Sequence, residues 1–228
     1  MPDRNIEKLN AGEKAVEFIE DGMLLGLGTG STVFYTIKKV GELVREGMKL
    51  EAVSTSSSTS QLAASLGIKI LPFEDITRTD LTIDGADEFD PDLNGIKGGG
   101  GALLYEKLVA EASERVIWVV DSGKRVNKLG NFPLPVEVVQ YGTKQLLRTF
   151  RERGYHPVLR LKDNKPYITD AGNNIIDLHL GEINKPEQLN REIKLLTGVV
   201  ETGLFLGIAD KVIVGIEDKT EIINRSPA

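Results

Sequence analysis

The stretch MLLGLGTGSTVFYTIKKV, residues 23–40, joins an apolar run to an amphipathic segment through a glycine-rich loop. The run at 23–28 predicts a short buried strand. After Ser31, apolar residues recur at helical spacing: Val33, Ile37, Val40 and Val44. Residues 31–46 are therefore predicted to form a helix. A strand that enters a helix in this way is typical of a βαβ unit.

The same alternation continues on both sides of this stretch. Further strands are predicted at 51–54, 69–71, 81–84 and 115–120. Helices are predicted at 6–19, around 61–66 and from about Gly101. Strands that alternate with helices predict an α/β domain with a mostly parallel, doubly wound sheet.

The pattern changes near Asn131, where FPLPVEVV is followed by a helix at 142–153, a run of strands, a helix at 186–196 and a strand at 198–202. This order predicts a small α+β domain similar to a ferredoxin-like sandwich. The run KVIVGIED at 211–218 predicts one more buried strand, which we expect to return to the first sheet. The expected boundaries are 1–130 and 204–228 for the α/β domain and 131–203 for the inserted domain.

Composition restricts the classes of function. The chain has 228 residues, a formal net charge of −6 and no cysteine. The absence of a basic run argues against nucleic acid as a partner, and the lack of cysteine excludes disulfides and thiolate sites. The polar N-terminus has no signal-peptide core, and no apolar run approaches the roughly 18 residues of a membrane span. We therefore expect a cytoplasmic protein with no membrane partner.

The loop GLGTGST, residues 26–32, is the first candidate site. It matches neither the dinucleotide fingerprint nor the Walker A loop, because its third glycine comes one residue early and no lysine precedes Ser31. Its amides and the hydroxyls of Thr29, Ser31 and Thr32 suit a single phosphate. The alternative is a tight turn with Ser31 as a helix cap.

The loop DGADEFDPDLNG, residues 84–95, is the second candidate, because it follows a strand whose carboxyl end should face a ligand crevice. Asp84 and Asp87 lie closest to the strand and form the predicted functional pair. Glu88, Asp90 and Asp92 are predicted to be solvated loop charges. A calcium loop is not expected, because Gly101 occupies the position of the bidentate glutamate.

The third candidate is KGGGGALLYEKL, residues 97–108. Four successive glycines before a helix suggest a close approach of backbone to a ligand, with Lys97 at the entrance. Glu106 shares a helix face with apolar residues, which would favour a general base. The alternative is a Glu106 that reaches solvent or pairs with a lysine. Lys107 and Glu111 are predicted to form a separate polar stripe.

Two further segments are weaker candidates. The hydroxyl-rich run VSTSSSTSQ at 53–61 is either a polar loop near the site or a capped helix start. Lys124, in the DSGK segment after a predicted strand, either meets an anionic ligand or is solvated.

Taken together, GLGTGST, DGADE, KGGGGALLYEK, DSGK and FPLPVEV resemble the ribose-5-phosphate isomerase type A family in order and spacing. The resemblance covers essentially the whole chain. It implies a Rossmann-like α/β domain with a smaller α+β domain inserted near the C-terminus. It also implies a homodimer or homotetramer, a phosphorylated pentose as substrate, and no metal or other cofactor.

The resemblance further implies the interconversion of D-ribose 5-phosphate and D-ribulose 5-phosphate through an enediolate, with Glu106 as the base. Asp84, Asp87 and Lys97 would assist, and either aspartate would move protons during ring opening. The implied substrate-binding residues are Thr29, Gly30, Ser31, Thr32, Asp84, Gly85, Ala86, Asp87, Lys97, Gly98, Gly99, Gly100 and Lys124. Lys8 would also reach the phosphate. One departure is Gly101, where the family often has alanine.

Two other functions remain open from the sequence. A sugar-phosphate sensor on the same fold would need no base, but it would normally be joined to a DNA-binding segment. A coenzyme A transferase also needs a catalytic glutamate, but nothing in the chain suggests a site for a nucleotide-bearing thioester.

Overall fold

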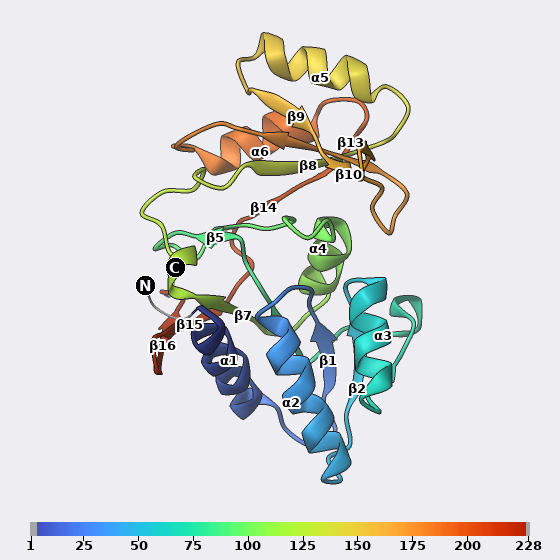
Figure 1. Cartoon of the computed structure of the whole chain (residues 1–228), viewed down its shortest axis with the longest axis vertical. Helices are drawn as coiled ribbons and strands as arrows, with labels where there is room; N and C mark the ends of the chain where they lie inside the picture. Colours follow the sequence, from blue (N-terminus) through green and yellow to red (C-terminus); the bar gives the residue numbers. More distant parts are fainter. Residues whose placement is uncertain (1–3, 227–228) are drawn as a thin grey trace. The chain divides into compact units, whose positions relative to one another are not determined.

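The computed structural model describes residues 4–226 (Figure 1). The chain divides into two compact units. The α/β unit comprises Met1–Ala86, Tyr105–Lys124 and Gly207–Ala228, and the α+β unit comprises Asp87–Leu104 and Arg125–Leu206. The domain boundaries predicted from the sequence, at 130/131 and 203/204, remain a prediction.

A seven-stranded sheet forms the centre of the α/β unit, in the order β16-β15-β7-β4-β1-β2-β3. Its strands are β1 (Leu24–Leu27), β2 (Glu51–Ser54), β3 (Lys69–Ile70), β4 (Leu81–Asp84), β7 (Val116–Asp121), β15 (Lys211–Ile216) and β16 (Lys219–Asn224). All neighbours pair in parallel except β15 and β16. This arrangement confirms the predicted doubly wound sheet and the return of the segment after Lys211 to it.

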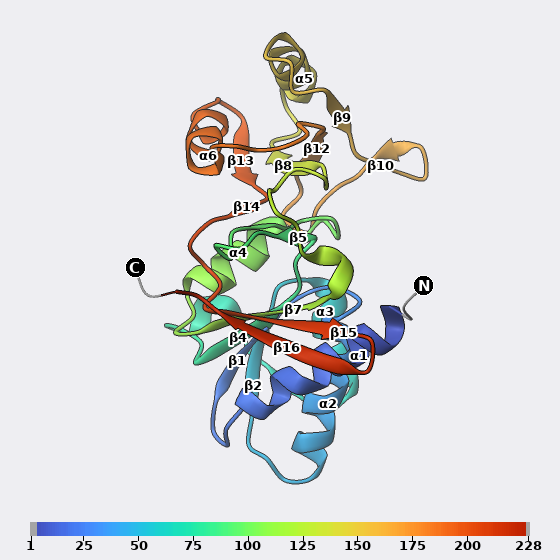
Figure 2. The same cartoon turned by 90° about the vertical axis from the view of Figure 1, so that its left-hand side faces the viewer.

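Helices α1 (Arg4–Ala15), α2 (Val33–Arg45), α3 (Ser57–Ser65) and α4 (Leu103–Glu111) connect or cover these strands, with short 3-10 turns η1 (Val16–Phe18), η2 (Phe73–Asp75) and η3 (Ser122–Lys124). Helix α1 packs against β7, β15 and α2 (Figure 2). The apolar side chains of α2 that were predicted to share one face are buried at Val33, Ile37 and Val40. They form one core with β1 and β4, which explains why this segment is helical.

The α+β unit contains the order β8, α5, β9, β12, α6, β13, with the sheet order β13-β8-β12-β9. The elements are β8 (Leu134–Val138), α5 (Thr143–Glu152), β9 (Pro157–Leu159), β12 (Asn174–Leu178), α6 (Pro186–Lys194) and β13 (Val199–Thr202). This βαββαβ order is that of the ferredoxin-like sandwich expected from the sequence. Smaller strands are β5 (Glu88–Phe89), β6 (Gly95–Ile96), β10 (Leu161–Lys162), β11 (Lys165–Pro166) and β14 (Leu204–Phe205).

The two faces of this four-stranded sheet differ in chemistry. Val136 and Val138 of β8 belong to a core with Ile176 of β12 and with Phe150 of α5. Because side chains alternate along a strand, Glu137 lies on the opposite face of β8. Asp177 lies between the core residues Ile176 and Leu178 of β12, so its side chain also points to the opposite face. The two acids therefore lie on the face of the sheet that is turned away from the core formed with α5.

Two predicted boundaries shift by two residues. Residues 211–218 do not form one strand, because Glu217 adopts a left-handed φ of 53° and the chain turns back as β16. The sequence showed no signal for β16, since an edge strand need not be apolar. Helix α4 begins at Leu103 rather than Gly101, whose φ of 84° is incompatible with a helix.

Candidate active site

The glycine loop after β1 is bound to the end of β4. Asp84 Oδ1 accepts hydrogen bonds from the N–H groups of Thr29 (3.0 Å) and Gly85 (2.7 Å). A Cβ atom at Gly28 would overlap the Asp84 carboxylate, so glycine is required for this approach. Asp84 is buried and positions two of the predicted substrate-binding segments against each other.

The hydroxyl of Thr29 bonds to a cluster of hydroxyls from the segment after β2. Its Oγ1 lies 2.8 Å from Thr55 Oγ1 and 2.8 Å from Ser56 Oγ. Ser56 also caps α3 by accepting from the N–H of Thr59. The hydroxyl-rich run therefore serves both as a helix cap and as a support for the glycine loop.

The end of this loop presents unused donors. Thr32 precedes α2, and no side-chain cap bond forms there, so the alternative in which Ser31 caps the helix is not observed. Within residues 4–226, the N–H groups of Gly30, Ser31 and Thr32 donate to no acceptor. Amides at the N-terminus of a helix favour a bound anion.

In the α+β unit, Asp87 joins the acidic segment to the four-glycine loop. Its Oδ2 accepts from the N–H of Gly99 at 2.7 Å. The prediction for Glu88 was wrong: its carboxylate is buried and accepts from the N–H groups of Gly130 and Phe132 (2.9 Å for Phe132). Asp90 is also not a freely solvated charge, because it closes a turn by accepting from the N–H of Asn94.

Lys97 is 3% exposed and lies beside the aromatic ring of Phe205, with 5.2 Å between Nζ and the ring centroid. Its backbone N–H donates to Gly203 O at 2.9 Å, which anchors the start of the glycine loop. The burial of this lysine places a cation within the protein, where its electrostatic effect is stronger than in water.

Glu106 is 4% exposed on α4, which confirms its predicted place on the apolar face. Val109 of the same helix packs closely on Gly26 of β1, where a Cβ would come within 2.8 Å of the valine Cγ1. Gly26 therefore lets α4 approach the sheet. The prediction that Lys107 and Glu111 form an exposed polar stripe was wrong for Lys107, which is buried. Glu111 is exposed, as predicted.

Lys124 lies in η3, immediately after β7, in the α/β unit. Glu7 of α1, which the sequence reasoning missed, holds this turn together with Asp121, whose Oδ1 accepts from the N–H of Gly123 at 3.1 Å. Glu7 is 1% exposed and accepts from Ser122 Oγ (2.9 and 3.0 Å), Ser122 N–H (3.2 Å) and Glu217 N–H (3.0 Å). Its spacing from Ala11 and Ala15, which are also buried, was the available signal.

Burial acts to raise the pKa of Glu7. The hydrogen bonds from Glu217 and Ser122, with the charge of Arg4, outweigh burial and hold the pKa of this carboxyl below its ordinary value. Glu7 is therefore a fixed anion that supports the turn containing Lys124.

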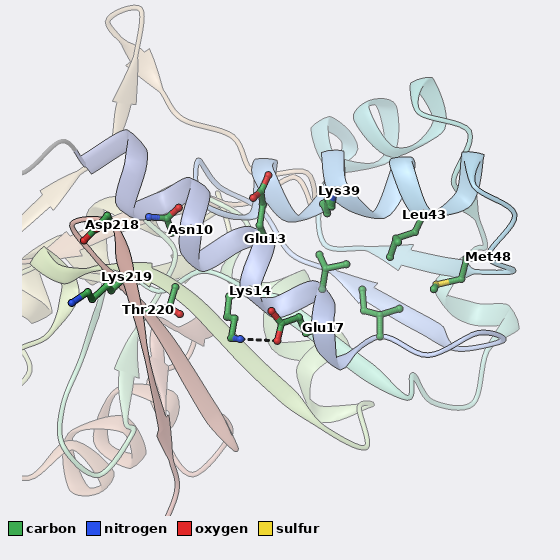
Figure 3. Close-up of a pocket in the computed structure, with 12 residues that line it drawn as sticks. Asn10, Glu13, Lys14, Glu17, Lys39, Leu43, Met48, Asp218, Lys219 and Thr220 are labelled. Carbon is green, nitrogen blue, oxygen red and sulfur yellow. Dashed lines mark hydrogen bonds and ion pairs between the residues drawn. The ribbon is translucent and has the colours of Figure 1, made fainter.

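A cavity of about 770 Å³ lies in the α/β unit (Figure 3). Its lining comes from α1, η1, α2 and the β15–β16 hairpin and includes the ion pair of Lys14 and Glu17 (2.6 Å). None of the predicted site residues lines this cavity. Its lining contains three lysines and three acids, so their formal charges cancel.

The predicted residues thus fall into two groups. Thr29–Thr32, Asp84–Ala86, Glu106 and Lys124 belong to the α/β unit, whereas Asp87 and Lys97–Gly100 belong to the α+β unit. Over residues 4–226, no cluster of three acid or histidine side chains has the geometry of a metal site. Every helix in the same range is too short or too polar to cross a bilayer.

The sequence is similar to that of known proteins over most of its length. Residues 51–219 match the family Ribose 5-phosphate isomerase A (phosphoriboisomerase A). Ribose-5-phosphate isomerase A of Streptococcus gordonii is 53% identical over 211 residues, 92% of this chain and 93% of the relative. The Enterococcus faecalis protein of the same name is 51% identical over 213 residues, 92% of this chain and 94% of the relative.

The fold matches solved structures equally well. The crystal structure of ribose 5-phosphate isomerase A from Neisseria gonorrhoeae has a TM-score of 0.92 and 39% identity, with 100% of both chains covered. A D-ribose-5-phosphate isomerase in complex with phospho-erythronic acid has a TM-score of 0.95 and 37% identity, covering 98% of this chain and 100% of that one. By class, the chain is an isomerase. It belongs to the ribose 5-phosphate isomerase A family.

Proposed function

We propose that this chain interconverts D-ribose 5-phosphate and D-ribulose 5-phosphate through an enediolate, with Glu106 as the general base. The observation that carries the assignment of the base is the burial of Glu106 on the apolar face of α4, directly after the four-glycine loop. A carboxylate withdrawn from water is a stronger base toward a carbon-bound proton than a solvated one. One base on one face of the sugar can move the proton between C2 and C1.

The other predicted groups take roles that fit their chemistry. Negative charge develops on O1 and O2 as the proton leaves carbon, and Lys97 with the amides of the glycine loop stabilises it. Asp84 or Asp87 moves hydroxyl protons during ring opening. No metal or other cofactor is needed in this scheme, because every step is a proton transfer.

The phosphate is assigned to the loop Thr29–Thr32. The donors of Gly30, Ser31 and Thr32 that have no acceptor within residues 4–226 support this assignment. Lys124, and Lys8 on α1, add positive charge to the same unit. Binding energy from this remote group contributes to stabilising the transition state at the reacting carbons.

The phospho-erythronic acid bound by the related isomerase supports the same scheme. The two oxygens of its carboxylate lie side by side, much as O1 and O2 do on the adjacent carbons of an enediolate. We therefore expect phospho-erythronic acid to inhibit this chain competitively. We also propose that the enzyme is a cytoplasmic homodimer or homotetramer, which sedimentation of the purified protein would test.

Glu106→Gln tests the assignment of the base. Glutamine keeps the shape of the side chain but cannot accept a proton from carbon, so kcat should fall by roughly 10²–10⁴ with little change in the affinity for phospho-erythronic acid. Exchange of solvent deuterium into C1 and C2 of the sugar should fall in parallel. Glu111→Gln, an exposed change on the same helix, is the matched control and should retain activity. If Glu106→Gln turns over and exchanges like the parent, another residue is the base.

A further inference from the structure

Two side chains of the α+β unit hold the four-glycine loop by donating hydrogen bonds to the carbonyl groups of the loop. Arg160, between β9 and β10, donates from Nη1 to Gly98 O at 2.7 Å and to Gly99 O at 3.1 Å. Tyr167 donates from its hydroxyl to Gly100 O at 3.4 Å. Three successive carbonyl groups of the loop therefore face donors from one segment of the same unit.

Arg160 is itself fixed. Its Nε donates to Asp177 Oδ2 at 2.9 Å and its Nη2 donates to Asp177 Oδ1, so the pair is bidentate. The side chains of Arg160 and Asp177 are only 15% and 18% exposed. The backbone N–H of Arg160 also donates to Ile175 O at 2.9 Å. A guanidinium held by a carboxylate on a central strand has little freedom to move, which suits it to set the position of a loop.

The N–H groups of the loop are used differently from its carbonyls. Gly99 N–H donates to Asp87, and Gly101 N–H donates to Gly98 O at 3.0 Å. The N–H of Gly100 donates to no acceptor within residues 4–226, and Gly100 is exposed. The loop thus offers a donor at Gly100 while its carbonyls are bound.

The carbonyl of Gly99 and the N–H of Gly100 belong to the same peptide group. A cationic donor on that carbonyl draws electron density through the conjugated peptide and makes the N–H a stronger donor. Arg160 therefore acts on the Gly100 N–H both by position and by polarisation. A side chain at Gly99 would prevent this arrangement, since its Cβ would lie 2.6 Å from Asp87 Oδ1.

We propose that Arg160, held by Asp177, is a positioning residue that orients and polarises the Gly99–Gly100 peptide so that the Gly100 N–H stabilises the developing oxyanion of the sugar. This inference rests on the proposed isomerase mechanism and extends it to a residue that never touches the substrate. It also accounts for the glycines, because the loop must pass closely between Asp87 on one side and Arg160 with Tyr167 on the other.

The test compares Arg160→Met and Arg160→Lys with the parent enzyme. Arg160→Met should lower kcat by about tenfold to a hundredfold, somewhat less than the loss of a whole oxyanion donor, with KM nearly unchanged. Arg160→Lys should recover part of kcat, because lysine reaches a carbonyl but cannot also form the bidentate pair. Lys194→Met is the matched control: Lys194 also donates to a backbone carbonyl, at Val200, and pairs with an acid, but it lies by the opposite edge strand of the sheet.

Two binding measurements separate this role from a purely structural one. Measured by calorimetry, the dissociation constant for phospho-erythronic acid should rise about tenfold in Arg160→Met, while the dissociation constant for inorganic phosphate stays within about twofold of the parent value. A kcat equal to that of the parent would overturn the inference. So would equal losses of phospho-erythronic acid and phosphate binding, or a loss of activity in Arg160→Lys that only follows a lower Tm. If the parent enzyme fails to isomerise ribose 5-phosphate, the proposed function fails, and the two dissociation constants, which need no turnover, still report on Arg160.

Discussion

The Oδ1 atom of Asp84 accepts a hydrogen bond from the N–H of Thr29 at 3.0 Å, which joins the carboxyl ends of β4 and β1. The same oxygen accepts from Gly85. One buried carboxylate therefore sets the relative position of a proposed phosphate loop and a proposed acid–base segment. Substituting the acid would remove both a charge and an acceptor, so its positioning role is better tested through its neighbour Gly28.

Gly28→Ala should destabilise the protein and weaken substrate binding together. The added Cβ would overlap the Asp84 carboxylate and force it away from Thr29. Overpacking of this kind costs about 1–3 kcal/mol in the free energy of unfolding. Urea unfolding of Gly28→Ala and Gly85→Ala provides the comparison, because a Cβ at Gly85 meets no atom closer than 3.8 Å. Equal stability of the two variants would contradict the steric argument.

The double variant S31A/T32A should raise KM without loss of the fold. Each hydrogen bond to a charged phosphate is worth about 1.5–3 kcal/mol, whereas the turn is set by backbone contacts that remain. Inorganic phosphate should also inhibit the variant less than the parent. Ser65→Ala, which removes an exposed hydroxyl at the end of α3, is the control. An unchanged KM with unchanged phosphate inhibition would place the phosphate at another loop.

Glu7→Gln should lower stability most at neutral pH. In the variant, the side-chain NH2 group replaces one of the two carboxylate oxygens that accept from the N–H groups of Ser122 and Glu217. Two hydrogen-bond donors would then face each other. Because the folded-state pKa of Glu7 lies below its unfolded value, its contribution to stability is present above about pH 4.5 and is lost as the pH falls through the folded pKa. The loss should be about 1–2 kcal/mol at pH 7 and should shrink toward pH 3.

Thermal unfolding from pH 3 to pH 8 measures this effect. Glu17→Gln, which removes an exposed ion-pair partner from the adjoining 3-10 turn, serves as the control and should change Tm little at any pH. A deficit in Glu7→Gln that stays constant with pH would show that the charge of Glu7 is not involved. The kcat of the variant would also report whether the turn with Lys124 has moved.

The fold was largely predictable because its central strands are buried on both faces. Every residue of β7 is buried, and a continuous apolar run of this kind is typical of a parallel sheet. The strands β5, β6 and β14 have two residues each, so they have no period that a sequence pattern can reveal. Strand β16 is an edge strand in which every residue is exposed or only partly buried, and its polar residues resemble a loop.

The site was predictable where burial follows local spacing. Glu106 shares its face with Val109 and Ala110, and all three are buried. Lys107 was assigned wrongly because α4 is covered over a wide arc, so neighbouring helix positions are both buried. Glu88 was missed for another reason: its donors lie 42 and 44 residues away, and only the folded chain brings them to its carboxylate.

Glu137 on β8 is a further buried acid that spacing did not single out. Its carboxylate accepts from Thr169 Oγ1 (2.8 Å) and Asn173 Nδ2 (3.0 Å), both through Oε1. Burial raises the pKa of Glu137, although hydrogen bonds from Asn173, Thr169 and the backbone of Leu104 oppose the shift. Leu104, in the same unit as Glu137, lies in the first turn of α4.

Glu137→Gln should stabilise the protein at high pH and leave its stability unchanged at low pH. Because the folded-state pKa is raised, the folded chain binds the proton more tightly than the unfolded chain does, so stability is lost as the pH rises through the folded pKa. Glutamine mimics the protonated form and can still accept from Thr169 and Asn173. The Tm of the variant should therefore exceed that of the parent at pH 8 and converge with it below about pH 4.5. Glu192→Gln, an exposed change on α6, should show no such crossover, and parallel curves for Glu137→Gln and the parent would exclude this role for the buried carboxyl.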